Sequence, residues 1–306
     1  MTARPGPSAK QEFAGGELWL GDCLAILRNL RQTSLARFDL AYLDPPFNTG
    51  KVHSARVNGG QRDSGSAAYD DSWGGLTGFL AMFEPRLAAL AELASPRASI
   101  WIHLDHRTVH DTKVLADRVL GRSAFAGEFI WVPGNGARRR GGPSVTHQTI
   151  LVYAPHGSMI WNSDDSALRE PYADTSLRMH FSNEDADGRR YRDRHIGGKT
   201  YRYYAETGRR LGSVWTDCPG MRANTPLIRE TTGYPTQKPE KLLDRILRAA
   251  SDADSLVLDP MCGSGTTLAV AARLHRRFLG IDQSPLAHQI ATHRLQVLEP
   301  AALASG

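Results

Sequence analysis

The sequence predicts an α/β protein with a mostly parallel sheet that helices cover on both faces. Short, continuous apolar runs alternate with helical patterns along most of the chain, which is typical of buried parallel strands. Four of those runs end in an acidic residue followed by turn-forming residues. With 306 residues, 41% of them hydrophobic, the chain is long enough for one large domain or one domain with an insertion. The expected strands are 18–20, 38–43, 98–104, 128–132, 256–258 and 278–281.

The bulk composition narrows the class of protein. The net charge of +5 suits a polyanionic partner without requiring one. Cys23, Cys218 and Cys262 are too few and too scattered for a disulfide framework or a tetrahedral zinc site. We therefore expect no metal and a reducing, cytoplasmic compartment. No apolar run approaches the roughly 20 residues that cross a bilayer, and the N-terminus lacks the apolar segment of a signal peptide, so no membrane partner is expected.

The pattern along the chain divides it into five expected segments. The two halves of the α/β domain are separated by a stretch in which the alternation of strands and helices is lost. The N-terminal tail is rich in Pro and Gly, without periodicity, so we expect order to begin at Glu17. The expected segments are a flexible tail (1–16), a first half (17–132), an insert (133–233), a second half (234–297) and a short tail (298–306).

The expected insert carries most of the basic surplus of the chain. Residues 133–215 hold 13 Lys and Arg against 9 Asp and Glu, a net +4. Aromatic side chains are interleaved with these basic residues, a composition that suits phosphate contact and base stacking. A solvated loop with a few buried tyrosines is the alternative interpretation. The side chains that we expect to contact phosphate are Arg138, Arg139, Arg140, Arg190 and Arg192.

The strongest signal for a functional site is the acid that follows each of four strands. Asp22 follows the strand at 18–20, and Asp44 follows the strand at 38–43. Asp259 and Asp282 follow the last two strands in the same way. Because open α/β sheets bind ligands beyond the carboxyl ends of their strands, we expect the four carboxylates to line one crevice.

A glycine turn follows Asp259 and leads into a helix. Gly263 and Gly265 in the segment 259–267 allow the backbone to approach a ligand closely. No Lys follows the second glycine, which disfavours a nucleoside triphosphate. Asp282 lies 23 positions after Asp259, near the spacing at which an acid accepts hydrogen bonds from ribose hydroxyls. The pattern therefore predicts a cofactor that contains adenosine.

The tetrapeptide Asp44-Pro45-Pro46-Phe47 is the second chemical motif. Its prolines lack N–H donors and have fixed φ angles, so they stiffen the turn and leave carbonyl oxygens available as acceptors. The amino group of an aromatic base is a poor nucleophile because its lone pair is conjugated with the ring. Asp44 and the Pro45 carbonyl are placed to accept its two hydrogens, and Phe47 offers a flat face for stacking. We expect these four residues to be catalytic.

Three ordered motifs resemble the amino-methylating DNA methyltransferases of the beta group. They are the segments 44–47, 234–243 and 259–267, and the catalytic motif precedes the cofactor motif. The resemblance spans residues 18 to about 295, apart from the insert. It implies a circularly permuted, Rossmann-like sheet that binds S-adenosylmethionine, with a target-recognition insert between a catalytic half and a cofactor-binding half.

The resemblance also assigns roles to individual positions. Asp282 would hold the ribose hydroxyls, Asp22 would lie beside the adenine, and Lys238 would face the methionine carboxylate. Met261 departs from the family's usual Phe, and Phe47 from its more frequent Tyr; we expect altered packing with activity retained. The positions assigned to the cofactor are Asp22, Thr236, Gln237, Lys238, Asp259, Pro260, Met261, Gly263, Gly265, Thr266 and Asp282.

The implied reaction is methylation of the exocyclic amino group of adenine in double-stranded DNA, with base flipping. Asp at the start of the catalytic tetrapeptide is commoner among adenine methylators, and cytosine-N4 methylation is the alternative. The sequence also leaves open methylation of RNA or of a protein glutamine, a DNA-binding protein without catalysis, and a nucleotide-binding oxidoreductase. Double-stranded DNA is the expected partner, and a homodimer and a separate restriction endonuclease are further candidate partners.

Overall fold

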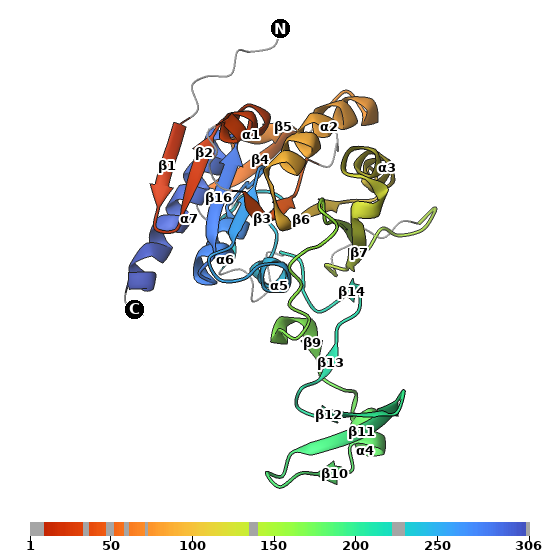
Figure 1. Ribbon diagram of the computed structural model, residues 1–306. Helices are drawn as coiled ribbons and strands as arrows, with labels where there is room; N and C mark the ends of the chain where they lie inside the picture. Colours follow the sequence, from red (N-terminus) through yellow and green to blue (C-terminus); the bar gives the residue numbers. More distant parts are fainter. Residues whose placement is uncertain are drawn as a thin grey trace.

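A computed structural model of the protein describes residues 9–32, 37–46, 52–57, 61–70, 73–134, 140–221 and 230–303. Within them the main feature is a nine-stranded sheet with the strand order β1-β2-β16-β15-β3-β6-β8-β7-β14 (Figure 1). The strands and helices are β1 (Ala9–Phe13), β2 (Gly16–Leu20), α1 (Cys23–Gln32), β3 (Phe38–Leu43), β4 (Val52–Val57), β5 (Gln61–Asp70), α2 (Leu76–Leu93), β6 (Ala94–Leu104), α3 (Val109–Leu120), η1 (Arg122–Ala124), β7 (Phe125–Trp131), β8 (Gln148–Tyr153), η2 (Ser166–Leu168), β9 (Arg169–Glu170), α4 (Asp174–His180), β10 (Asn183–Glu184), β11 (Arg190–Ile196), β12 (Lys199–Tyr204), β13 (Arg209–Arg210), β14 (Val214–Trp215), α5 (Glu240–Ala250), β15 (Leu256–Asp259), α6 (Thr266–Arg273), β16 (Arg277–Asp282) and α7 (Pro285–Leu303).

The centre of the sheet is parallel, as the continuous apolar runs predicted. Strands β2, β16, β15, β3 and β6 lie side by side and run in one direction. Numbered from β15, the first four strands along the permuted chain take the spatial order 3-2-1-4, the order at the centre of a doubly wound sheet. The strands that precede Asp22, Asp44, Asp259 and Asp282 are therefore four neighbours, and their carboxyl ends meet at one edge.

The far end of the sheet corrects the expected boundaries of the insert. Strand β8 lies between β6 and β7 and is antiparallel to both, and β14 adds to the outside of β7. Both strands fall within residues 133–233, which were expected to form an insert as a whole. Ile150, Leu151 and Val152 in β8 are buried, so this apolar run extends the sheet. The aromatic and charged residues around it hid that signal in the sequence.

The N-terminal boundary also differs from the expectation. Residues 9–13 were expected in a flexible tail, but they form β1, which pairs with β2 in antiparallel register from Ala9–Leu20 to Phe13–Gly16. Without this strand, one side of β2 would be an open edge with unpaired backbone groups. A tight turn that places Gly15 at a φ of 90° makes the pairing possible. Regular structure therefore begins before Glu17, the residue at which it was expected to begin.

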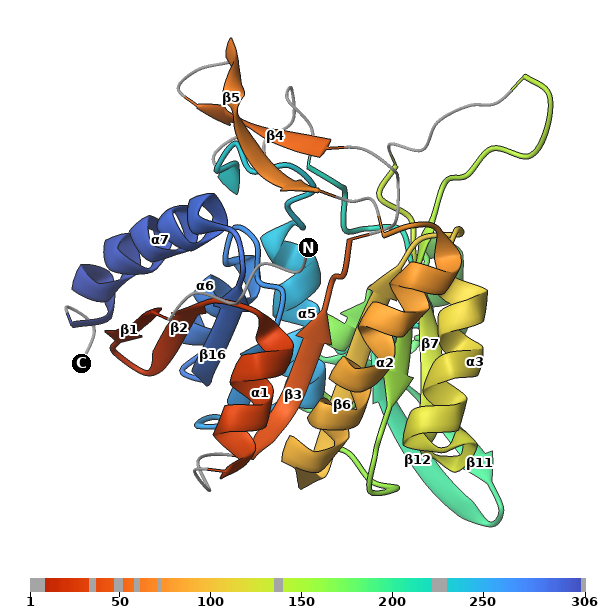
Figure 2. The same cartoon turned by 90° about the horizontal axis from the view of Figure 1, so that it is seen from above.

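Helices cover both faces of the sheet, which agrees with the predicted fold class. Helices α1, α2 and α3 pack on one face, and α5, α6 and α7 pack on the other (Figures 1 and 2). Each layer has its own apolar core: Leu27, Phe83 and Leu90 belong to the first, and Leu243 and Leu268 to the second. Within the described part of the chain, no helix combines the length and the apolar character needed to cross a membrane.

Residues 169–210 form an arm that projects from the body of the molecule on the side of α5 (Figure 1). Strands β9 and β13 pair at its base, and β10, β11 and β12 form a three-stranded antiparallel sheet beside α4. A separate antiparallel hairpin, β4–β5, lies toward the end of the molecule opposite to β11 and β12 (Figure 2). The arm has the mixed aromatic and basic composition that the sequence indicated.

A buried arginine joins the base of this arm to the body. Arg245 in α5 donates two hydrogen bonds to the carboxylate of Asp217, at 2.8 and 2.6 Å, and a third to the Ala167 carbonyl at 2.9 Å. Its guanidinium also lies 5.1 Å from the ring of Trp215. Arg245 holds the pKa of Asp217 well below its usual range. The contacts fix both chain segments that flank the arm.

We expect Arg245→Ala to lower the free energy of unfolding by about 2–3 kcal/mol, because it removes the three hydrogen bonds of a buried guanidinium. Arg248→Ala, on the same helix, removes a more exposed pair with Asp244 and should change the free energy by less than about 1 kcal/mol. Urea unfolding of both variants checks this. Equal losses in the two variants would contradict the role assigned to Arg245.

Candidate active site

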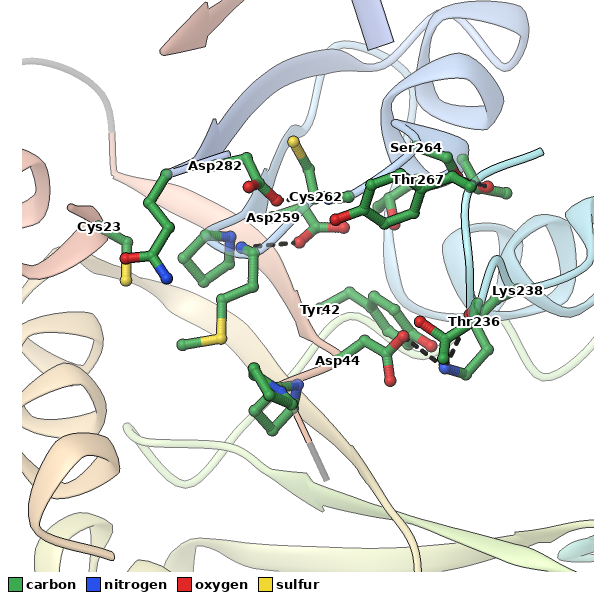
Figure 3. A pocket seen from close by; sticks show the side chains of 18 of the residues that line it. Cys23, Tyr42, Asp44, Thr236, Lys238, Asp259, Cys262, Ser264, Thr267 and Asp282 are labelled. Carbon is green, nitrogen blue, oxygen red and sulfur yellow. Dashed lines mark hydrogen bonds and ion pairs between the residues drawn. The ribbon is translucent and has the colours of Figure 1, made fainter. Parts of the chain in front are cut away.

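The four acids line one cleft at the carboxyl edge of the central strands, as the sequence predicted. The cleft is open to solvent, and the empty space within and above it amounts to about 980 Å³ when open solvent is included. Residues that follow β2, β3, β15 and β16 meet there with the segment that precedes α5 (Figure 3). The predicted residues that line it are Asp22, Asp44, Pro45, Pro46, Thr236, Gln237, Lys238, Asp259, Pro260, Met261, Gly263, Thr266 and Asp282. Gly265 lies at the N-terminus of α6, directly beside this lining.

The turn after β15 requires its two glycines. Gly263 and Gly265 have φ angles of 50° and 71°, in the region that other residues adopt at a cost. A Cβ atom on Gly265 would lie 2.8 Å from the Cβ of Ala291 in α7, and one on Gly263 would lie 3.1 Å from the Tyr234 ring. The turn is therefore compressed between α7 and the cleft, and its backbone forms part of the cleft wall.

Asp259 and Asp282 hold this turn; Asp259 is buried and Asp282 is partly buried. The Asp282 carboxylate accepts hydrogen bonds from the backbone N–H groups of Gly263 and Ser284, each at 2.8 Å. Asp259 accepts from the N–H of Met261 at 3.1 Å. Burial raises the pKa of Asp282, and it raises that of Asp259 to about 7, with added repulsion from Asp44 and Asp282. Among the described residues neither carboxylate has an ion-pair partner, so near neutral pH the two favour a positively charged ligand.

Asp22 also lines the cleft, and each oxygen of its carboxylate has one partner within the protein. Its Oδ1 accepts from the N–H of Ala25 at 3.0 Å, which caps helix α1. Its Oδ2 forms an ion pair with Arg86 of α2. Arg86 also donates to the sulfur of Cys23 and to the Met82 carbonyl, at 3.1 and 2.7 Å. Asp22 therefore presents its remaining lone pairs to the cleft from a fixed position.

Asp44 forms an ion pair with Lys238, a residue 194 positions later in the chain (Figure 3). The Lys238 side chain is 7% exposed, and its Nζ also lies 3.5 Å from the Thr236 carbonyl oxygen. Only Oδ2 of Asp44 takes part in the pair. Oδ1 is buried and has no hydrogen-bond partner among the residues that the structure describes. A buried acceptor without a donor is costly, so Oδ1 is placed to accept a donor from a ligand.

The segment 234–238 is held by hydrogen bonds of Gln237. Its side chain accepts from the N–H and hydroxyl of Thr232, at 2.9 and 2.8 Å, and donates to the Glu230 carbonyl at 2.7 Å. Thr236 has a φ of 61°, a strained conformation for a residue with a Cβ. The strain and the bracing fix the loop that delivers Lys238 to Asp44. Gln237 lines the cleft as predicted, but its amide is used inside the loop.

The cleft contains residues that the sequence analysis missed. Arg86 and Met82 come from α2, and Tyr42 lies in β3 before the catalytic tetrapeptide. None of these residues belongs to a motif. An arginine within the apolar pattern of α2 was a detectable signal, because a helix face that packs on a sheet seldom includes a charge without a partner.

Of the five arginines predicted to contact phosphate, the structure describes Arg140, Arg190 and Arg192. Phe47, Arg138 and Arg139 lie outside the described residues, and Arg140 is exposed. In the arm, Arg190 donates to the carbonyls of Leu177 and Phe181 at the end of α4, at 2.9 and 3.0 Å.

Arg192 is used inside the arm in the same way as Arg190. Its guanidinium lies 4.9 to 5.6 Å from the rings of Tyr172, Phe181 and Tyr203. Both arginines thus bind groups within the arm, whose β11 and β12 project away from the β4–β5 side of the molecule (Figure 2). Their predicted phosphate contacts would compete with these internal contacts.

Comparison with known proteins identifies a family and two relatives. The sequence matches the profile of a family described as DNA methylase, N6_N4_Mtase, over residues 38–293. The Type II methyltransferase M.EcaI of Enterobacter cloacae is 26% identical over 329 residues, which cover 92% of this chain and 69% of that protein. The Type II methyltransferase M2.LlaDCHI of Lactococcus lactis is 25% identical and covers 90% and 87%.

Solved structures share the fold at low sequence identity. The PvuII DNA methyltransferase, named as cytosine-N4-specific, matches with a TM-score of 0.56 and 14% identity over 96% of this chain and 94% of that one. The complex of M1.HpyAVI with S-adenosylmethionine matches with a TM-score of 0.53 and 17% identity, over 92% and 99%. The α/β architecture of the cleft is therefore a known one.

The raised pKa of Asp259 gives a test of the site's electrostatics. In the unfolded chain Asp ionises near its usual pKa of about 4, whereas folded Asp259 stays neutral up to about pH 7. The folded state therefore binds the extra proton, and stability is lost as the pH rises between these values. The side chain of Asp259→Asn cannot ionise. The free energy of unfolding of this variant, relative to that of the wild type, should therefore increase between about pH 4 and 7 and stay constant above pH 7.

Chemical unfolding of both proteins at pH 5, 6, 7 and 8, without ligand, measures this difference. Asp187→Asn, at an exposed turn of the arm, is the control and should show no such trend. Parallel stability curves for Asp259→Asn and the wild type would contradict the assignment of Asp259.

Proposed function

Because this chain belongs to the N6_N4_Mtase family of DNA methylases, we propose that it methylates the exocyclic amino group of adenine in double-stranded DNA. It is a DNA methyltransferase of the amino-methylating type, and S-adenosylmethionine is the methyl donor. The observation that carries the proposal is the Oδ1 atom of Asp44, a buried acceptor without a partner among the described residues, beside the two-proline turn. An amino group supplies the donor that this atom lacks.

The residues of the cleft fit the cofactor. S-Adenosylmethionine carries a sulfonium and an ammonium group, and the carboxylates of Asp259 and Asp282 favour a cation. Asp282 and Asp22 keep lone pairs for ribose hydroxyls and for the adenine amino group. Lys238 is the cation that would meet the methionine carboxylate, and it already binds Asp44. The cofactor supplies an electrophilic methyl group when it is bound.

The protein side of the reaction follows from the catalytic turn. The target base leaves the DNA stack at a cost of about a few kcal/mol, because its amino group is otherwise out of reach. Asp44 Oδ1 and the Pro45 carbonyl accept the two amino hydrogens and favour a nitrogen lone pair that points away from the ring. The nitrogen that gains the methyl group must lose one proton, and Asp44 Oδ1, which accepts that hydrogen, would take the proton and pass it to solvent. Orientation of the two reactants contributes most of the rate.

We assign DNA contact chiefly to the loop after β7. Strand β7 is parallel to β6, so its C-terminal end lies at the same edge of the sheet as the cleft. The loop that follows carries Arg138, Arg139 and the exposed Arg140. Arg190 and Arg192 would act by fixing the shape of the arm. The relatives named as Type II methyltransferases support a role that protects DNA from a separate restriction endonuclease.

Asp44→Ala should lower kcat by about 100-fold or more, because the acceptor for the amine is lost, while S-adenosylmethionine still binds. Asp44→Asn keeps an acceptor but loses the charge that pairs with Lys238, and we expect an intermediate kcat. Transfer of tritiated methyl groups to DNA and calorimetry with the cofactor measure the two effects. Normal turnover in Asp44→Ala would overturn the catalytic assignment.

Nucleoside analysis of DNA methylated by the wild-type protein tests the choice of base. We expect N6-methyl-2′-deoxyadenosine as the methylated nucleoside. N4-methylcytosine would show that the family's other amino group is the target. RNA and a glutamine-containing protein serve as control substrates and should remain unmethylated.

Replacing Arg138, Arg139 and Arg140 together with Ala should weaken DNA binding and flatten its dependence on salt. Each lost phosphate contact reduces the slope of log K against log salt by about 1. Fluorescence anisotropy between about 50 and 200 mM salt measures the slope. Replacing Arg209 and Arg210, at the base of the arm, is the matched control and should leave the slope unchanged.

A further inference from the structure

A buried chain of three polar side chains lies behind the catalytic turn. The hydroxyl of Tyr42 in β3, two residues before Asp44, lies 2.7 Å from Nδ1 of His103 in β6. Nε2 of His103 lies 2.6 Å from Oε1 of Gln148, the first residue of β8. His103 is fully buried, and Tyr42 is nearly so. Three neighbouring strands thus contribute one hydrogen-bonded chain, and Tyr42 brings it to the cleft.

The proton positions in this chain follow from the chemistry of its members. Oε1 of Gln148 only accepts, so Nε2 of His103 carries a proton and donates it. The pKa of His103 is well below its usual range because burial disfavours the imidazolium and Lys238 repels it. A neutral imidazole with its proton on Nε2 has a bare Nδ1. The Tyr42 hydroxyl therefore donates its proton to His103 and presents only lone pairs elsewhere.

The chain is coupled to the ion pair that serves the reaction. Tyr42 lines the same cleft as Asp44 and Lys238 (Figure 3). Burial and the negative charge of Asp44 raise the pKa of Tyr42 well above its usual value. The positive charge of Lys238 helps to lower the pKa of His103. If the hydroxyl of Tyr42 were not held by His103, the side chain would be free to move toward the cleft and donate to a neighbouring carboxylate. Asp44 would then be a competing acceptor, and its lone pairs are the ones that the target amine needs.

We propose that His103 is a positioning residue for methyl transfer. By accepting the proton of Tyr42, it prevents that hydroxyl from binding Asp44 and keeps the Asp44–Lys238 pair in the arrangement that leaves Oδ1 open. The effect belongs to the step in which the amine gives its hydrogens to Asp44, so it appears in kcat and not in KM. The proposal rests on amino-group methylation and is independent of the choice between adenine and cytosine.

Packing alone gives no reason for these three polar groups. The His103 ring lies edge-on against Trp131, with centroids 5.3 Å apart, in a part of the sheet whose other buried side chains are mainly apolar. An apolar side chain of similar size would fill the same space with no polar atom to satisfy. A buried polar network stabilises a protein only when every member is paired. Its position directly behind Asp44 gives the network a functional reason.

Two substitutions of His103 separate the roles of its two nitrogens. His103→Asn keeps an acceptor near the place of Nδ1 and loses the donor to Gln148. His103→Gln reaches Gln148 and loses the acceptor for Tyr42. Loss of one hydrogen bond of about 1.5 kcal/mol corresponds to about tenfold in rate. We therefore expect kcat to fall at least about tenfold in His103→Gln and less than about fivefold in His103→Asn, with both KM values unchanged.

Tyr42→Phe tests the same contact from the other side. It removes the hydroxyl that His103 restrains and the lone pairs that face the cleft, so kcat should fall by about as much as in His103→Gln. The double variant Tyr42→Phe/His103→Gln should lose no more than the worse single variant, because both changes remove one interaction. Losses that multiply in the double variant would overturn the proposal.

The assay counts tritiated methyl groups transferred from S-adenosylmethionine to unmethylated phage DNA. It scores either base, so a failure of the adenine assignment appears in the nucleoside analysis and leaves these ratios intact. His110→Asn, exposed on α3, is the control and should keep the wild-type kcat. Thermal unfolding of each variant shows whether it is folded. Equal loss of kcat in folded His103→Asn and His103→Gln would overturn the proposal, because it would reflect packing alone.

A spectroscopic measurement keeps the proposal testable if a His103 variant does not fold. Histidine labelled with ¹⁵N in the wild-type protein reports the tautomer of each ring, and the His103 signal is identified by its change in Tyr42→Phe. We expect a neutral ring with its proton on Nε2 at about pH 7.5. An imidazolium, or a proton on Nδ1, would overturn the proposal because the Tyr42 hydroxyl would then be free to donate elsewhere.

Discussion

The ion pair between Asp44 and Lys238 is the interaction on which the cleft depends. It joins the turn after β3 to the loop before α5, two segments far apart in the sequence. The pair is largely buried, so each charge needs the other to offset the loss of solvation. The two oxygens of the Asp44 carboxylate also differ: Oδ2 binds Lys238, and the lone pairs of Oδ1 remain open to a ligand. One contact thus joins the two segments and leaves open the acceptor that we propose for the target amine.

The remaining charges of the cleft follow from the parallel sheet. Four neighbouring strands end in acids at one edge, and in the described part of the chain Arg86 and Lys238 are the cations that line the cleft there. Asp259 and Asp282 are left to hydrogen bonds from backbone N–H groups, and burial raises their pKa values. Carboxylates without a cationic partner lower the stability of the ligand-free protein and raise its affinity for a cationic ligand. The sulfonium and ammonium groups of the cofactor have the charge that this balance favours.

The arm has a separate physical basis. Its charged and aromatic side chains bind one another: Arg192 lies among three rings, and Arg202 pairs with Asp193 while it packs on Tyr191. Cation–π contacts of this kind hold a small unit that has little apolar core of its own. Arg245 and Asp217 then fix its base to the body. Basic residues in this region therefore stabilise the arm itself, whether or not they also contact a partner.

The sequence by itself determined the parallel core and the four acids at one edge, and it predicted a catalytic role for the turn at 44–47. These features are local: a continuous apolar run predicts a buried strand, and the residue that follows it must lie at the strand's carboxyl end. The central strands and the family were predicted correctly for this reason. The apolar run in β8 is equally local, but its aromatic and charged surroundings led us to place it in the insert.

Only the tertiary structure decided which side chains meet. The pairing of Lys238 with Asp44, the ion pair between Arg86 and Asp22 and the chain from Tyr42 to His103 join residues that are distant in sequence and belong to no common motif. The addition of β1 to β2 likewise depends on an open edge that no single segment reveals. Local patterns fix where a residue lies along a strand or helix. Packing across the sheet fixes what it touches, and hence which donors and acceptors are left for a ligand.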